Sequence, residues 1–253
     1  MAFDPLAPLR ADPGAGAILL DVDGTLAPIA SHPDRSVVPS ATLATLELLV
    51  ARYALVACVS GRAAADAARL VPVDGLVVAG NHGLELLEGG ASRWADGVEP
   101  WLPAVRRAAD LLGPLALEVG GWVEDKGGTL TVHIREAPDP EAARAALEAH
   151  AVPLIAAQGL GWRWGRRALE ARPPVAIDKG SCVRDLIATK SAVACALYAG
   201  DDLTDVDALR AVDIGVAVRS DETPAEVLAA AAVVVEGPAA LADLLAGLAV
   251  DCA

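Results

Sequence analysis

Aromatic residues are scarce in this sequence: they make up 3% of the 253 residues, whereas hydrophobic residues as a whole make up 54%. The hydrophobic core must therefore be built mainly from Ala, Val and Leu. Cysteine is also rare, and the four cysteines have neither Cys-x-x-Cys spacing nor a regular framework. This pattern favours buried free thiols over a metal or disulfide framework. The four positions are Cys58, Cys182, Cys195 and Cys252.

Long apolar runs and an excess of positive charge are missing too. No run approaches the roughly 18 residues of a membrane span, and the N-terminal residues do not resemble a signal peptide. The net charge is −14 and the pI is about 4.6, so the chain repels nucleic acid and anionic membranes. We therefore expect a soluble, cytoplasmic monomer with neither kind of partner. A phosphorylated substrate would be repelled as well, unless a metal or a local positive charge receives it.

The first hundred residues alternate between apolar runs and segments of helical periodicity. Runs at residues 17–20, 54–59 and 75–79 are typical of buried strands, and residues 40–50 and 63–70 are predicted helices. Strands that alternate with helices predict a parallel sheet covered on both faces. Each run ends in polar residues or glycine, and open α/β sheets bind ligands at that edge.

The pattern changes after about residue 100. Helices are predicted at residues 100–112 and 139–150, an antiparallel hairpin at 116–123 and 129–135, and short strands near 154–157 and 168–171. From residue 178 the alternation resumes. It predicts helices at residues 181–188, 205–209 and 238–248, and strands at residues 192–199, 214–218 and 233–235.

These patterns predict an α/β fold in two parts. A doubly wound, Rossmann-like parallel sheet is formed by residues 1–99 and 174–253. A smaller α+β cap domain, residues 100–173, is inserted over the carboxyl edge of that sheet.

Two carboxylates follow the first predicted strand, at Asp21 and Asp23 in Asp-Val-Asp-Gly-Thr. Their spacing places both near one cavity, where one can attack phosphorus and the other can donate or accept a proton. Gly24 permits a tight turn, and Thr25 adds a hydroxyl and a backbone donor. The pattern also fits a plain Asx-rich turn that ends a strand.

Three further elements lie at strand ends or helix starts. Ser60 follows the second strand and could donate to a phosphoryl oxygen, and Lys179 begins a helix whose amides could face an anion. Asp201, Asp202 and Asp205 follow a later strand, where their mutual repulsion calls for a cation such as Mg²⁺. Each alone also fits a bland interpretation, namely an ordinary loop serine, an exposed lysine and a solvated acidic loop.

Together these residues resemble the haloacid dehalogenase superfamily of phosphatases, over nearly the whole chain. The resemblance implies that Asp21 is the nucleophile of an aspartyl-phosphate mechanism and that Asp23 is the general acid and base. It implies phosphoryl binding by Ser60 and Lys179. It also implies a Mg²⁺ site that involves Asp21, the backbone carbonyl of Asp23, and Asp201, supported by Asp202 and Asp205 directly or through water.

Finer motifs resemble the trehalose-6-phosphate phosphatase family. They are Ser60-Gly61-Arg62, the Gly80–Glu85 segment Gly-Asn-His-Gly-Leu-Glu, Val123-Glu-Asp-Lys-Gly127, His133-x-Arg135, Glu170-x-Arg172-Pro173 and Asp178-Lys-Gly180. The resemblance implies hydrolysis of trehalose 6-phosphate to trehalose and phosphate. It assigns substrate contacts to Glu124, Lys126 and Glu170 on the cap side, and to Thr25, Arg62, Asn81 and His82 on the core side.

One position departs from the family pattern: Val206 follows Thr204-Asp205 where Glu is frequent, and Val can neither ligate nor hydrogen-bond. Three alternatives stay open. Another sugar phosphate, such as sucrose phosphate or mannosyl-3-phosphoglycerate, could be the substrate. The chain could be a non-catalytic phosphoacceptor module, although such modules place the acceptor Asp where this chain has Ser60. It could also be a sugar-binding protein with an inactive site.

Overall fold

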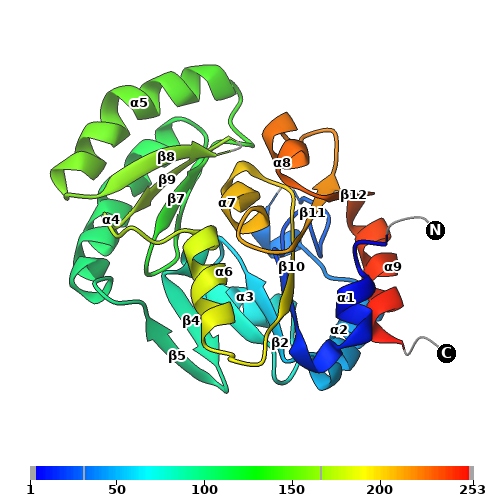
Figure 1. Ribbon diagram of the computed structural model, residues 1–253. Helices are drawn as coiled ribbons and strands as arrows, with labels where there is room; N and C mark the ends of the chain where they lie inside the picture. Colours follow the sequence, from blue (N-terminus) through cyan, green and yellow to red (C-terminus); the bar gives the residue numbers. More distant parts are fainter. Residues whose placement is uncertain (1–3, 31, 166, 251–253) are drawn as a thin grey trace. The chain divides into compact units, whose positions relative to one another are not determined.

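The computed structural model describes residues 4–30, 32–165 and 167–250 (Figure 1). Contacts divide the chain into two compact units. Residues up to 93 and from 177 onward form the first, and residues 94–176 form the second. The boundaries expected from the sequence, at 99/100 and 173/174, lie a few residues from these.

The first unit is built on an eight-stranded sheet of order β12-β11-β10-β1-β2-β3-β4-β5. The pairings from β12 to β3 are all parallel, which confirms the predicted Rossmann-like core. The strands are β1 (Gly16–Leu20), β2 (Leu55–Val59), β3 (Val77–Gly80), β4 (Glu85–Glu88), β5 (Ala91–Trp94), β10 (Cys195–Gly200), β11 (Ile214–Arg219) and β12 (Val233–Glu236).

Helices cover both faces of this sheet because successive strand residues point to opposite sides. Ile18 and Leu20 of β1 pack with α1, α2, α3 and α9, whereas Ala17 and Leu19 pack with α6, α7 and α8. Figure 1 shows α2 and α9 side by side on their face. The helices are α1 (Ala7–Ala11), α2 (Ser40–Arg52), α3 (Ala64–Leu70), α6 (Lys179–Ala188), α7 (Val206–Leu209), α8 (Ala225–Ala230) and α9 (Gly237–Ala249).

The strands β4 and β5, at one edge of the sheet, were not predicted from the sequence. β4 runs antiparallel to β3, and a turn at Gly89 and Gly90 leads from β4 into β5. Both glycines have positive φ, at 57° and 80°, a combination that type I′ hairpin turns require. The Gly-Gly pair was therefore an overlooked hairpin signal. The short helix α8 was not predicted either.

The second unit is an α+β layer. Its sheet has the order β6-β7-β9-β8, from β6 (Trp122–Asp125), β7 (Leu130–His133), β8 (Gly161–Gly165) and β9 (Ala168–Arg172). One face packs on α4 (Leu102–Glu118) and α5 (Pro140–Ala157), in a core of Ala, Leu, Val and Ile.

Both helices of this unit are longer than the sequence suggested. The strand expected at 116–123 was wrong except for its last two residues, which begin β6, because α4 continues past Pro114 to Glu118. The strand expected near 154–157 was wrong because α5 continues past Pro153. In each helix, apolar residues at helical spacing are buried both before and after the proline, so the packed face continues past it. That packing outweighs the backbone hydrogen bond that a proline removes.

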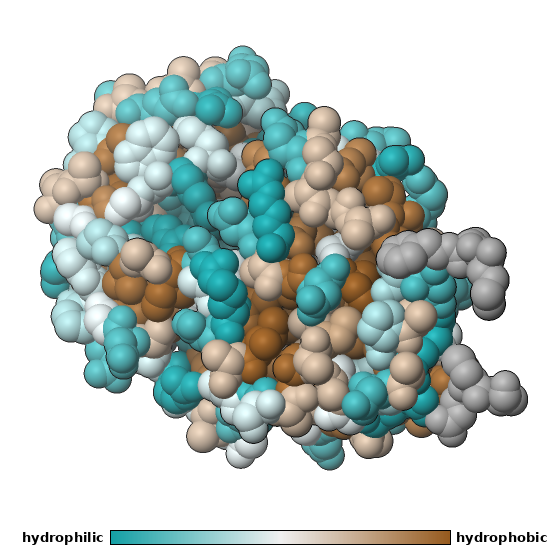
Figure 2. All heavy atoms as spheres, viewed as in Figure 1, coloured by the Kyte–Doolittle hydropathy of each residue, from teal (hydrophilic) through white to brown (hydrophobic). Residues whose placement is uncertain are grey.

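Several large apolar side chains are exposed at the surface. Figure 2 shows apolar residues interspersed with hydrophilic ones on the face that it draws. Single exposed apolar side chains are normal in globular proteins. Cys58 and Cys182 are buried free thiols as expected, Cys195 is partly buried, and Cys252 lies outside the described residues. In the described ranges, every helix is too short or too polar to cross a bilayer.

The α2 helix offers a matched test of this core. Leu49 is fully buried between α2 and the sheet, whereas its neighbour Leu48 is 56% exposed. We expect Leu49→Ala to lower the free energy of unfolding by about 2–5 kcal/mol, because it removes packed methyl groups and leaves a cavity. Leu48→Ala should change it by less than about 0.5 kcal/mol. Denaturant unfolding measures both, and equal losses would contradict the assigned packing.

Candidate active site

The site begins where β1, β2 and β10 end. Leu20 pairs with Cys58 on β2 and with Ala199 on β10, so the residues that follow these strands emerge at one edge. The chain runs from β1 toward β2 and β3 on one side, and later returns to β10, β11 and β12 on the other. The position between β1 and β10 is therefore the topological switch point, the usual ligand site of such sheets.

Asp21 is the first residue past β1, and its backbone amide donates to Ala199 at 2.9 Å. Its side chain is 7% exposed. The carboxylate lies 2.8 Å from the ammonium of Lys179, the first residue of α6. The Lys179 side chain is itself only 3% exposed, so the predicted interpretation of an exposed lysine does not hold.

Asp205 holds the other side of this lysine. Its Oδ1 accepts from Lys179 Nζ at 2.8 Å and from the hydroxyl of Tyr198 at 2.6 Å. Its Oδ2 accepts from the backbone amides of Asp201 and Asp202 at 3.1 and 2.9 Å. A carboxylate has about four lone-pair positions, and these four donors use them. Asp205 is therefore built to orient Lys179 and the loop after β10. Tyr198 was not predicted as a site residue, because it is a lone hydroxyl in an apolar strand.

Asp201 completes a group of buried carboxylates. Asp21, Asp201 and Asp205 offer oxygens within 4.8 Å of one another. The hydroxyl of Thr25 is 3.4 Å from Asp201 Oδ1. Gly24, at φ +83°, brings its backbone so close that a Cβ would lie 2.3 Å from Asp201 Oδ2. An oxygen-only, carboxylate-rich donor set of this kind suits a hard divalent cation.

The pKa values in this group follow from burial and mutual repulsion. Burial raises the pKa of Asp21 well above its usual value; the charges of Asp205 and Asp201 raise it further, and Lys179 opposes them. Burial would lower the pKa of Lys179, but the facing Asp205 and Asp21 raise it above its usual value. The pKa of Asp205 is lowered despite its burial, because Lys179, Tyr198 and a backbone amide stabilise its charge. The lysine therefore offsets only part of the negative charge, and a divalent cation fits the remainder.

Asp23 faces a different cation, Arg62. The guanidinium donates from Nε to Asp23 Oδ2 at 2.6 Å and from Nη2 to Oδ1 at 2.7 Å. The hydroxyl of Ser36 donates to Oδ1 at 2.9 Å, a contact that sequence reasoning missed. Ser60 is 1% exposed, and its Oγ accepts from the Arg62 amide at 3.2 Å. The predicted residues Asp23, Ser60 and Arg62 are thus brought together.

Asn81 and His82 directly follow β3 and contact the loop after β2. Asn81 is fully buried and His82 is 9% exposed. Both have positive φ, at 51° and 58°. This backbone conformation costs roughly 1 kcal/mol or more for a residue other than glycine. Their amides donate to Arg62 O at 2.6 Å and Ser60 O at 2.9 Å. The strained turn therefore holds the loop after β2, and Glu85 supports it by accepting from Asn81 Nδ2 at 3.0 Å.

The contacts of Asp202 indicate a local structural role. Its Oδ1 accepts from the Leu203 amide at 2.6 Å and caps the short 3₁₀ turn Leu203–Asp205. It is not one of the three grouped carboxylates found in the described residues.

Two of the three predicted cap residues, Glu124 and Glu170, share one face of the small sheet. The pairing places Glu124, Thr131, Glu170 and Arg163 in one row across β6, β7, β9 and β8. Arg163 Nε donates to the buried Glu170 at 2.5 Å. Glu124 lies 2.8 Å from His133 Nε2, and the His133 ring stacks on Trp122 with centroids 4.2 Å apart. This face is polar, in contrast to the helix-covered face.

Lys126 lies in the turn between β6 and β7. It is partly buried, and its amide donates to Thr129 O at 2.9 Å. The turn therefore has ordered backbone bonds rather than being a loose solvated loop.

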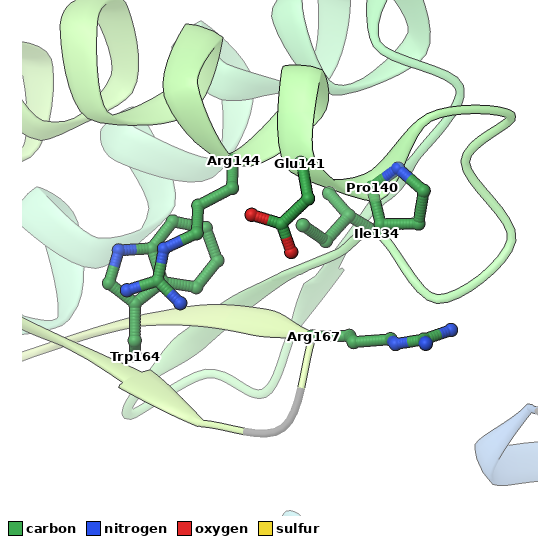
Figure 3. A pocket seen from close by; sticks show the side chains of 6 residues that line it. All are labelled: Ile134, Pro140, Glu141, Arg144, Trp164 and Arg167. Carbon is green, nitrogen blue, oxygen red and sulfur yellow. The ribbon is translucent and has the colours of Figure 1, made fainter.

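A separate pocket of about 220 Å³ lies beside the start of α5 (Figure 3). Arg144 stacks over the ring of Trp164, with its guanidinium carbon 4.5 Å from the centroid. In Figure 3 Glu141 points into the pocket, while Arg167 extends away from Trp164. Its lining differs from the predicted substrate residues, and it consists of Ile134, Pro140, Glu141, Arg144, Trp164 and Arg167.

Comparison with known proteins decides the family. The family model described as trehalose-phosphatase matches residues 19–230, which include every core residue named above from Asp21 to Asp205. The chain belongs to the trehalose-phosphatase family. Its family relatives include the trehalose-phosphate phosphatase of Mycobacterium marinum, 33% identical over 92% of this chain and 61% of that protein. A Mycobacterium tuberculosis protein described as an uncharacterised glycosyl hydrolase is 35% identical over 81% of this chain but 16% of its own length.

Solved structures support the fold of this trehalose-phosphatase family member. A trehalose-6-phosphate phosphatase related protein superposes with a TM-score of 0.80 at 23% identity, over 92% of this chain and 96% of that one. The C-terminal domain of the Candida albicans trehalose-6-phosphate phosphatase gives 0.76 at 20% identity, over 97% and 95%. The chain therefore spans about three fifths or less of the curated relatives named above, and nearly all of these solved chains.

Val206, the departure from the family pattern, has a structural place. It opens α7 and packs against the apolar cluster of α6, α7, α8 and the sheet. Asp205, immediately before it, keeps all its contacts with Lys179 and Tyr198. The presence of Val at position 206 therefore leaves the cluster of Asp21, Asp201 and Asp205 intact.

The cluster of the Asp21, Asp201 and Asp205 carboxylates predicts specific binding of a divalent cation. We expect Mg²⁺ to raise the melting temperature of the wild-type protein, since a ligand that binds only the folded state stabilises it. Asp201→Asn should remove most of that increase. Asp202→Asn should retain it, because Asn can still cap the 3₁₀ turn. Thermal melts in a Mg²⁺ titration measure the effect, and loss in Asp202→Asn alone would contradict the assignment.

The raised pKa of Asp21 predicts that protons compete with the cation. A carboxyl whose pKa is raised takes up its proton at a higher pH than usual, so a bound cation must displace that proton as pH falls. The apparent affinity for Mg²⁺ should therefore weaken as pH is lowered from neutral into the acid range, and it should begin to do so at a higher pH than for an ordinary carboxylate site. Calorimetric titrations at several pH values test this, and an affinity that is constant over the range would count against it.

Proposed function

We propose that this chain is a divalent-metal-dependent phosphatase that hydrolyses trehalose 6-phosphate to trehalose and phosphate. The observation that carries the proposal is the buried Asp21 carboxylate at the switch point, 2.8 Å from Lys179 and grouped with Asp201 and Asp205. Family membership supports the substrate. The chain spans only part of its curated relatives, so their activity is extended to it here as an inference.

Asp21 serves as the nucleophile. One of its oxygens attacks phosphorus, the bond from phosphorus to the sugar oxygen breaks, and an aspartyl-phosphate forms. Asp23 gives a proton to the departing sugar oxygen. It then takes a proton from the water that attacks the phosphoryl group, which releases phosphate and restores Asp21. Each carboxylate has its own cationic partner, Lys179 for Asp21 and Arg62 for Asp23.

Lys179 and Ser60 bind the phosphoryl group. A lysine ammonium has three donors, and two of them are directed to Asp21 and Asp205. We assign the third to a phosphoryl oxygen. Ser60 uses its oxygen as an acceptor for the Arg62 amide, which leaves its hydroxyl proton for a second phosphoryl oxygen.

The cation is inferred to be Mg²⁺, held by Asp21, Asp201 and the backbone carbonyl of Asp23. When bound it neutralises phosphoryl charge during transfer. Asp205 orients Lys179, and Asp202 caps the loop; either could contact the cation's water shell.

Residues 100–173 are inferred to be the specificity cap. Glu124, Lys126 and Glu170 are proposed to bind sugar hydroxyls, which is supported by the shared polar sheet face of the two glutamates. Thr25 and Arg62 are proposed on the core side. The backbone amides of Asn81 and His82 donate to Arg62 O and Ser60 O, so we assign these two residues to support of the loop that carries Ser60 and Arg62.

The remaining inferences concern the setting of the reaction. The net charge of −14 supports an enzyme that acts as a cytoplasmic monomer on a small molecule, with no nucleic-acid or membrane partner. A sugar phosphate other than trehalose 6-phosphate, or stable phosphorylation of Asp21 without turnover, would be an alternative outcome of the experiment below.

The substrate is tested with purified protein, Mg²⁺ and a panel of sugar phosphates. We expect kcat/KM to be highest for trehalose 6-phosphate. Clear preference for sucrose phosphate or mannosyl-3-phosphoglycerate would replace the substrate but retain the chemistry. Slow release of phosphate from a stably phosphorylated protein would instead favour the phosphoacceptor interpretation.

The nucleophile is tested by Asp21→Asn. This change removes the attacking carboxylate, so kcat should fall by at least about a thousandfold. The control is Asp66→Asn, which changes a partly exposed carboxylate of α3 that pairs with Arg69 and should leave kcat unchanged. Release of phosphate over time measures both, and substantial turnover by Asp21→Asn would refute the assignment.

A further inference from the structure

We propose that Arg62 is a positioning residue that aims Asp23 at the leaving-group oxygen. The inference rests on the proposed phosphatase function and goes beyond the sugar contact expected for Arg62 from the sequence. It stands on how the Arg62 side chain is used in the folded protein.

The pair between Arg62 and Asp23 is bidentate. Two guanidinium nitrogens meet two carboxylate oxygens, at 2.6 and 2.7 Å. Such a fork fixes the plane of the carboxylate as well as its distance. A lysine in the same place would supply charge without that direction.

The fork is anchored from a second side. Arg62 Nη2 also lies 3.0 Å from the Pro33 carbonyl and 2.9 Å from Ser36 Oγ, and Ser36 donates to Asp23 Oδ1. The loop around residues 33–36 therefore braces both partners. The Arg62 side chain is 10% exposed, whereas that of Asp23 is 38% exposed. Arg62 is thus the buried support, and Asp23 is the member of the pair that can reach a ligand.

The backbone of Arg62 is held as well. Its amide donates to Ser60 Oγ at 3.2 Å, and its carbonyl accepts from the Asn81 amide at 2.6 Å. Ser60, assigned to the phosphoryl group, and Arg62 are therefore set by one loop. A displacement of Arg62 moves the proton donor relative to the reacting phosphorus, and a misplacement of about 1 Å can cost roughly a hundredfold in rate.

The orientation of Asp23 matters in the first chemical step, when the leaving oxygen receives a proton. As Asp21 forms its bond to phosphorus, the bond to the leaving oxygen breaks and the proton on the Asp23 carboxyl moves to that oxygen. A leaving group of high basicity, such as a sugar alkoxide or phenolate, needs this proton. A nitrophenolate leaves readily without it.

The test uses two aryl phosphates that contain no sugar, phenyl phosphate and p-nitrophenyl phosphate, with Mg²⁺ and the full chain. The quantity measured is kcat/KM, which includes binding and transfer to Asp21 but not hydrolysis of the aspartyl-phosphate. For Arg62→Gln we expect kcat/KM on phenyl phosphate to fall roughly tenfold more than on p-nitrophenyl phosphate. Ser36→Ala should shift the ratio in the same direction but less, and Arg62→Lys should restore it in part.

The matched control is Arg69→Gln, which breaks an exposed arginine–aspartate pair on α3 with a distance of 3.0 Å. It should leave the ratio of the two substrates unchanged. Circular dichroism and thermal melts of each variant establish that the fold is retained.

Equal losses on both aryl phosphates in folded Arg62→Gln would overturn the positioning role. Unchanged aryl activity with a loss confined to the sugar phosphate would also overturn it, and would assign Arg62 to the sugar. If the wild-type protein hydrolyses no phosphate monoester, the proposed function fails first. If it does so with an unaltered ratio in the variant, only the inference about Arg62 fails.

Discussion

The active-site architecture depends on one buried ammonium placed between two carboxylates. Lys179 lies 2.8 Å from both Asp21 and Asp205, and all three side chains are almost entirely inside the protein. An isolated buried charge would be costly, so each member requires the others. Asp201 adds a further carboxylate to the same group. One lysine cannot balance three carboxylates, and this surplus is the physical reason why the site calls for a divalent cation.

A second layer of contacts keeps the loops in register with this centre. Asn81 and His82 adopt positive φ that only a well-braced backbone maintains, and their amides hold the carbonyls of Ser60 and Arg62. Arg62 in turn fixes Asp23. The loops after β1, β2 and β3 are therefore connected by hydrogen bonds, so the position of the proton donor depends on residues that a substrate need not touch. Local strain of this kind is common around functional sites.

Much of the first unit could be predicted because buried parallel strands are short apolar runs that end in polar residues. The grouping of Asp21 and Asp201 follows from that rule, whereas Lys179 begins α6 and was expected beside them from the family resemblance. Local patterns failed where tertiary packing prevailed, as in the helices that continue past Pro114 and Pro153. Local patterns also could not show which donors each carboxylate oxygen accepts from. Four donors converge on Asp205, which favours an orienting role for a residue that the sequence placed among the metal ligands.

The central claim is that Asp21, held by Lys179, carries the phosphoryl group during turnover. Quenching the reaction in acid within milliseconds of mixing, reducing with borohydride and mapping the peptides tests it most directly, because reduction converts an aspartyl-phosphate to homoserine. We expect homoserine at position 21 in substrate-treated protein, with none in a sample mixed without substrate. Homoserine at another aspartate, or continued turnover with position 21 unmodified at every time point, would contradict it.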